Sequence, residues 1–134
     1  MDIDVPEVKA ELEAAFAAYE AALVDNDVAA LDAFFLEAPH VIRYGVAENL
    51  YGHAEIAAFR AARSPAGLAR SLARTVVTTY GRDFGVAATL FRRDNTPAKV
   101  GRQMQSWVRM AGQWRIVAAH VSIIDDPDHP AHRG

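Results

Sequence analysis

Hydrophobic residues recur every three or four positions through the first third of the chain, a spacing typical of amphipathic helices. The pattern predicts a long helix over residues 6–25 and a second helix over 28–36, for which Asp27 is a suitable N-cap. A third helix is expected over 53–63. The apolar face of the first helix consists of Val8, Leu12, Ala15, Phe16, Tyr19 and Leu23.

In the second half of the chain, runs rich in β-branched residues alternate with short turns, which is typical of strands. Strands are predicted over 70–80, 84–92, 99–110 and 113–123. A shorter strand is expected over 40–44, followed by a loop over 45–52. Helices that precede a run of antiparallel strands indicate an α+β fold. We therefore expect one domain over residues 1–124 and a flexible tail over 125–134.

The last predicted strand is apolar on both faces. Regular alternation gives one face Trp114, Ile116, Ala118, His120 and Ser122, and the other Val117, Ala119, Val121 and Ile123. We place His120 and Ser122 on the inner face, beside Trp114. Since the helices can cover only one face of the sheet, the row that contains Val121 is expected to pack against a second copy of the chain. We therefore predict a homodimer.

Composition limits the chemistry that the chain can perform. Its 134 residues suit a single domain, and 51% hydrophobic and 23% charged residues are typical of a soluble globular protein. The chain has no cysteine, which excludes disulfides and thiolate chemistry. No apolar run is long enough for a membrane span, and the acidic residues at 2 and 4 do not suit a secretory signal. We expect a cytoplasmic protein.

The net charge of −3 conceals an uneven distribution. Residues 1–38 contain ten acids and one base, whereas residues 41–117 contain twelve bases and four acids. Most of these bases are arginines, which suit bidentate recognition of carboxylate or phosphate, although pairing with the acidic first helix is the simpler alternative. With a pI of about 5.9 and no basic run, nucleic-acid binding is not expected.

Arg43 is the most informative charged residue, because it interrupts the apolar run that predicts the strand over 40–44. A guanidinium cannot be deprotonated, so burying it without a partner is costly. Arg43 therefore either forms an ion pair with a carboxylate of its own chain or points into a pocket that binds an anion. The sequence leaves both alternatives open.

Other polar residues could contact the same ligand. Tyr19 carries a phenol that could donate a proton inside a dry pocket, or it could be an ordinary core tyrosine. The alternation of Gln103, Gln105 and Trp107 could place two amides toward a urea-like group. The substrate-binding candidates are His120, Ser122, Gln105, Trp107, Arg74 and Asn49, each with a structural alternative such as a satisfied core histidine or a solvated side chain. The histidines lack metal-ligand spacing, so we expect no metal and no cofactor.

Four segments resemble a known family. The hairpin "GQWRIVAAHVS" resembles the closing strands of the nuclear-transport-factor-2-like superfamily. The segments "FAAYEAALVDND", "VIRYGVAENLYGHAEIAAFRAAR" and "RTVVTTYGRDF" resemble the AtzH-like proteins within it. The similarity covers about residues 5–123. It implies a cone in which three N-terminal helices pack against a curved, mostly antiparallel sheet.

The resemblance also implies an activity. AtzH-like proteins are linked to amidases that break down nitrogen-rich compounds such as cyanuric acid. The implied enzyme is a hydrolase, a decarboxylating amidase that converts 1,3-dicarboxyurea to allophanate, with Tyr19 and Arg43 as the catalytic pair and no cofactor. Two alternatives stay open at this point: a non-catalytic binding protein that assists a partner amidase, and an isomerase or dehydratase of the same superfamily. The scarcity of acidic residues in the basic half disfavours the isomerase.

Overall fold

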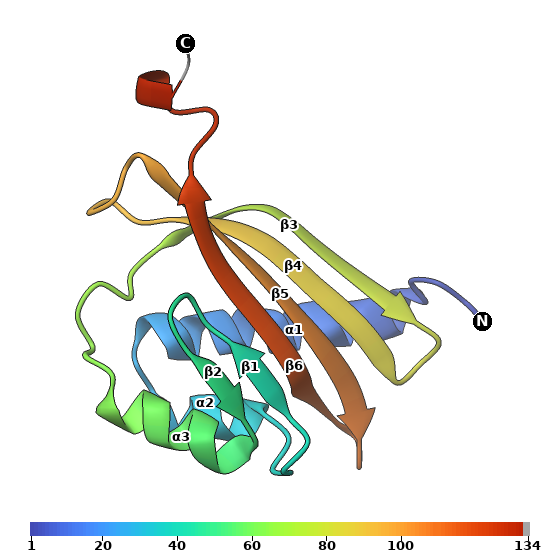
Figure 1. Ribbon diagram of the computed structural model, residues 1–134. Coiled ribbons are helices and arrows are strands. Elements are labelled where there is room, and N and C mark those ends of the chain that lie inside the picture. The colour runs from blue at the N-terminus through green and yellow to red at the C-terminus, as the bar shows by residue number, and fades with distance from the viewer. Residues whose placement is uncertain (133–134) are drawn as a thin grey trace.

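Three helices and a six-stranded sheet make up residues 1–132, which the computed structural model describes (Figure 1). The helices are α1 (Pro6–Val24), α2 (Val28–Phe34) and α3 (His53–Ala62), and the chain also contains the short 3-10 helix η1 (Pro130–His132). The strands are β1 (Ile42–Tyr44), β2 (Asn49–Tyr51), β3 (Ser71–Tyr80), β4 (Phe84–Arg92), β5 (Lys99–Met110) and β6 (Gln113–Asp125). The predicted α+β class and all three predicted helices are confirmed.

The sheet has the order β2-β1-β6-β5-β4-β3, and only the β1–β6 pair is parallel. In that pair Arg43 lies beside Ala119. The expectation of a plain loop over 45–52 is wrong, because this segment returns as β2 and pairs with β1. A hydrogen bond from the Gly45 amide to the Glu48 carbonyl closes the hairpin. Strands of three residues are too short for a period-two pattern to reveal.

A β-bulge in β6 reverses the faces that regular alternation predicts. Trp107 pairs with Ile116, and Ser106 pairs with Ala118, so Val117 has no partner on β5. Ile116 before the bulge and Ala119 after it are therefore both buried. The predicted row from Val117 to Ile123 is wrong as an outer face.

The same bulge corrects the placement of two candidate site residues. Beyond it, His120 and Ser122 lie on the outer face, opposite the side that we predicted. His120 is exposed, and its ring lies 6.2 Å from that of Tyr44. The Ser122 hydroxyl accepts a hydrogen bond from Arg102 at 3.1 Å. Neither side chain is directed toward the helices.

The core lies between α1 and the inner face of the sheet, on which the helices pack (Figure 1). Leu12 is fully buried and approaches β4 at Gly85, where a Cβ atom would lie only 2.3 Å from the Leu12 side chain. Glycine is therefore required for this close contact. Full burial of a leucine-sized side chain contributes about 1.5–3 kcal/mol. The core cluster includes Val8, Leu12, Phe16, Tyr19, Leu31, Phe35, Trp107 and Ile116.

The chain after β6 makes contacts of its own. Asp126 is buried, and its carboxylate accepts a hydrogen bond from Arg92 at 3.0 Å. This bond, together with the amide of Asp128, lowers the pKa of Asp126. The proposed flexibility of 125–134 stays a prediction, and residues 133–134 lie outside the described part of the chain. None of the helices in residues 1–132 is both long and apolar enough to cross a membrane.

Candidate anion-binding site

Tyr19 lies where α1 meets the inner face of the sheet. It is 97% buried, and its ring makes edge contacts with Phe34 at 5.8 Å and with Trp107 at 6.3 Å between centroids. The Tyr19 hydroxyl accepts a hydrogen bond of 3.0 Å from Arg60. Its own proton is not donated to any residue in 1–132. The phenol is therefore held in place and still has a proton to donate.

Arg60 is the residue that the sequence analysis missed. It is 1% exposed and lies one turn beyond the buried Ile56 on α3, with its guanidinium 5.1 Å from the centroid of the Phe35 ring. Its Nε and Nη1 atoms are buried and have no hydrogen-bond partner in the described chain. The i, i+4 spacing from Ile56 was the available signal, because that position belongs to the apolar face of the helix.

Arg43 points from β1 toward α3, where its guanidinium lies 5.4 Å from the centroid of the Phe59 ring. Its Nη1 atom lies 3.0 Å from a carboxylate oxygen of Glu48, in the turn between β1 and β2. Arg43 thus has an internal carboxylate partner, the first of the two alternatives left open by the sequence. The pair is partly exposed, with side-chain exposures of 11% and 23%.

Arg63 and Arg93 extend the positive region from the end of α3 to the end of β4. Burial lowers the pKa of Arg63, and the neighbouring charges of Arg60 and Arg43 lower it further. Burial and the charge of Arg70 lower the pKa of Arg93 in the same way. Both side chains have buried nitrogens that lack a hydrogen-bond partner in residues 1–132.

Arg70, which immediately precedes β3, is the arginine that reaches the interior, rather than the predicted Arg74. Its guanidinium donates two hydrogen bonds to Glu20, at 2.6 and 2.7 Å, and a third to Gln103 Oε1 at 3.0 Å. It also lies 4.4 Å from the centroid of the Phe91 ring. Arg74 sits in a β-bulge with φ of 53° and is exposed, so the expectation that it adds charge to the pocket is wrong.

The remaining predicted residues divide between the two faces. Gln105 and Trp107 are 2% and 0% exposed on the inner face of β5, one of the two placements that the sequence left open, and the Trp107 ring nitrogen donates to Gln105 Oε1 at 3.1 Å. Asn49 is exposed on β2, away from this interior. The structure therefore brings Tyr19, Arg43, Gln105 and Trp107 toward one region and excludes His120, Ser122, Arg74 and Asn49.

The electrostatics of this region act on Tyr19. Burial alone raises the pKa of the phenol, but the charges of Arg60, Arg43 and Arg70 and the Arg60 hydrogen bond outweigh it. The net effect lowers the Tyr19 pKa below its ordinary value of 10.0. The arginines thus stabilise the phenolate, which makes Tyr19 a better proton donor.

Most of the unpaired buried groups in the described chain are hydrogen-bond donors, and the exceptions are oxygens of Asn26, Asp32 and Thr79. Nine buried side-chain polar atoms in residues 1–132 have no partner, and the six that are nitrogens all belong to Arg60, Arg63, Arg93 and Gln103. We call these four residues and Tyr19 the donor cluster. Leaving one buried donor unpaired costs about 1–3 kcal/mol. Such a group can bind an anion or another ligand rich in acceptors, and its composition does not suit a cation.

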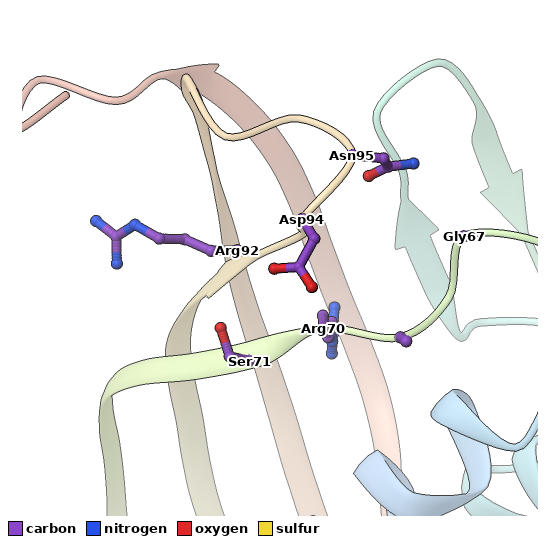
Figure 2. A pocket seen from close by; sticks show the side chains of 7 residues that line it. Gly67, Arg70, Ser71, Arg92, Asp94 and Asn95 are labelled. Atoms are coloured by element: carbon purple, nitrogen blue, oxygen red, sulfur yellow. The ribbon is translucent and has the colours of Figure 1, made fainter. Parts of the chain in front are cut away.

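A separate hollow of about 430 Å³ lies between segments 67–71 and 92–95 (Figure 2). Arg70 belongs to its lining, while the head of the same side chain reaches Glu20 inside the domain. Asp94 and Ser71 face this hollow. Because it contains a carboxylate, it is less suited to an anion than the donor cluster. No group of three or more metal-binding side chains occurs in the described residues.

Comparison with known proteins places the chain in a family. The sequence model described as AtzH-like matches residues 1–127. The chain belongs to the AtzH-like family. A crystal structure from Pectobacterium atrosepticum, of a DUF3225-family protein of unknown function, is 54% identical, with a TM-score of 0.90 over 92% of this chain and 96% of that one. A cystatin-like fold protein from Burkholderia xenovorans is 46% identical, with a TM-score of 0.91 over 95% and 99% of the two chains.

More distant solved structures show the fold alone. A nuclear-transport-factor-2-like protein of unknown function from Pseudomonas putida is 18% identical and has a TM-score of 0.73 over 94% of this chain and 92% of that one. This likeness confirms the expected nuclear-transport-factor-2-like architecture. The search of curated proteins gave no match.

Proposed function

We propose that this AtzH-like protein binds a small dianionic N-carboxylated urea at the donor cluster and converts 1,3-dicarboxyurea to allophanate. The observation that carries the proposal is Tyr19, a buried phenol with a free proton, hydrogen-bonded to Arg60 within a group of unpaired donors. The donor cluster supports the class of ligand, an anion. The choice of 1,3-dicarboxyurea rests on the family resemblance.

The chemistry follows from the charges. Arginines bind the carboxylates of the substrate, and one C–N bond breaks so that carbon dioxide leaves and its electron pair stays on the nitrogen. Tyr19 donates its proton to that nitrogen, which gives the amino group of allophanate. Arg60 and Arg43 stabilise the resulting phenolate, and a proton from solvent restores the phenol. Each turnover thus consumes one proton and releases one carbon dioxide.

The test is turnover of ¹³C-labelled 1,3-dicarboxyurea by the purified protein without any partner, followed by ¹³C NMR. Formation of allophanate and labelled carbon dioxide or bicarbonate, faster than in buffer, supports the proposal. Binding without turnover would instead assign the protein as an accessory component for a partner amidase. The variant Arg82→Ala, which removes an exposed arginine paired with Glu7 on the surface, is the control for loss of positive charge alone.

A further inference from the structure

The orientation of the Gln103 amide is dictated by its neighbour. Arg70 can only donate hydrogen bonds, so the Gln103 atom that lies 3.0 Å from its guanidinium must be the carbonyl oxygen. Arg70 is itself immobilised, because two hydrogen bonds attach it to Glu20 and its side chain is 2% exposed. The amide nitrogen of Gln103 therefore points away from Arg70.

Phe91 and Gly101 support the same arrangement. The Phe91 ring lies under Arg70 and also 4.9 Å from the guanidinium of Arg93. A Cβ atom at Gly101 would lie 2.0 Å from this ring, so only glycine leaves room for Phe91 here. The ring, the ion pair and the glutamine thus form one packed unit on the inner face of the sheet. This unit keeps the Gln103 amide in a single orientation.

The Gln103 nitrogen is a donor without a partner. Gln103 is 97% buried, and its Nε2 atom has no hydrogen-bond partner in residues 1–132. Two positions along β5, the oxygen of Gln105 is likewise occupied by a donor, the ring nitrogen of Trp107. Both amides are thus fixed with their oxygens engaged, and the group that Gln103 offers is neutral N–H.

We propose that Gln103 is a specificity-determining residue that donates a hydrogen bond to the central carbonyl oxygen of the substrate. The arginines of the donor cluster carry the charge that suits carboxylates, whereas Gln103 offers an uncharged donor that suits an uncharged acceptor. Arg70 and Glu20 act as positioning residues, because they hold the amide in the orientation that directs N–H to the ligand. This inference rests on the proposed function for the identity of the ligand.

The experiment compares two dicarboxylate analogues of the substrate by isothermal titration calorimetry, with 3-oxoglutarate freshly dissolved and kept cold because it is a β-keto acid that slowly loses carbon dioxide. 3-Oxoglutarate has the substrate's two carboxylates and central carbonyl, with CH₂ groups in place of NH, and glutarate lacks only the carbonyl. The wild type should bind 3-oxoglutarate about tenfold more tightly than glutarate, the effect of one buried hydrogen bond. Gln103→Met has a similar volume and no donor, so it should abolish this preference and leave glutarate affinity within about threefold.

Three further variants sharpen the result. Gln113→Met, at an exposed position of β6, is the matched control and should retain the preference. Gln103→Glu should lower the affinity for both ligands, because it adds a negative charge to the donor cluster. Arg70→Lys keeps the charge but cannot hold Glu20 and Gln103 together in the same way, so the ratio of the two affinities should fall while glutarate still binds.

Failure of this inference differs from failure of the proposed function. If Gln103→Met is folded and keeps the wild-type preference for 3-oxoglutarate, or if the wild type binds neither ligand, the role of Gln103 is refuted. If the preference for 3-oxoglutarate depends on Gln103 but 1,3-dicarboxyurea is not turned over, the recognition role of Gln103 is supported and the proposed chemistry is refuted. Circular dichroism melts establish that each variant is folded before its affinities are compared.

Discussion

Replacing Tyr19 by phenylalanine removes one hydroxyl and leaves the rest of the side chain intact. The edge contacts with Phe34 and Trp107 stay, so the core keeps its packing. What disappears is the acceptor of the Arg60 hydrogen bond, at 3.0 Å. Arg60 then has three nitrogens without partners instead of two, since Nε and Nη1 are already unpaired. Tyr19→Phe should therefore lower the free energy of unfolding by about 1.5–3 kcal/mol, as expected for a hydrogen bond to a charged group.

Loss of the hydroxyl should also reduce turnover. A positioned general acid contributes about 10²–10⁴-fold to a rate. Tyr19→Phe should therefore reduce kcat for 1,3-dicarboxyurea by at least about a hundredfold, while the affinity for 3-oxoglutarate changes less. The rate is measured by ¹³C NMR at a temperature where melting curves show the variant to be fully folded.

Tyr80→Phe makes the same chemical change at a partly exposed position at the end of β3. It should alter stability by less than about 0.5 kcal/mol and leave turnover unchanged. If folded Tyr19→Phe turns over substrate at the wild-type rate, the proton comes from another group and the role given to Tyr19 is refuted.

The remaining predictions concern the arginines, the outer face and metal dependence. The general acid must be protonated, so activity should fall as pH rises through the lowered Tyr19 pKa. Arg60→Met removes the charge that lowers this pKa most, and it should therefore shift the alkaline limb of the pH–rate profile to higher pH. Arg43→Lys should reduce turnover by removing the planar fork. Arg43→Ala should also destabilise the fold by up to about 1 kcal/mol in thermal melts, because Glu48 loses its partner. We still propose a homodimer through the outer face, where Met104 is 56% exposed; Met104→Glu should give monomers in light scattering, and a monomeric wild type contradicts the proposal. Turnover should survive EDTA, and its loss with restoration by zinc would show that a metal site was overlooked.

Much of the fold could be predicted, because long amphipathic and β-branched segments carry strong periodic signals. The short strand β2 could not, since three residues show no period. Which face of the sheet a residue of β6 occupies was predictable only up to the bulge. Trp114 and Ile116 were placed correctly, whereas the extra residue Val117 puts His120 on the opposite face from the one predicted. Bulges depend on pairing between strands, and a single sequence does not display that pairing.

The candidate site was predicted in part for similar reasons. Arg43 was found because it interrupts an apolar run, and Gln105 was found from alternation along β5. The role of Tyr19 and Arg43 as a catalytic pair came from the family resemblance. Arg60 was available from its helical spacing but was passed over, because a charged residue on a helix of mixed polarity is usually solvated. Regular alternation would place Arg70 and Arg74 on the same side, and the bulge between Ala73 and Val76 displaces Arg74, so the sequence alone could not distinguish them.

The parallel pairing of β1 with β6 has a consequence for how the protein is made. Arg43 on β1 is set beside Ala119, which lies 76 residues further along the chain. During synthesis, β1 leaves the ribosome long before the strand that must hold it, so its guanidinium has no fixed position until the final strand has joined the sheet. Closing such a long loop carries an entropic cost and is slow compared with the formation of local helices and hairpins. A chain that stops before β6 should therefore accumulate α1 and the β3–β4 hairpin without a competent binding site.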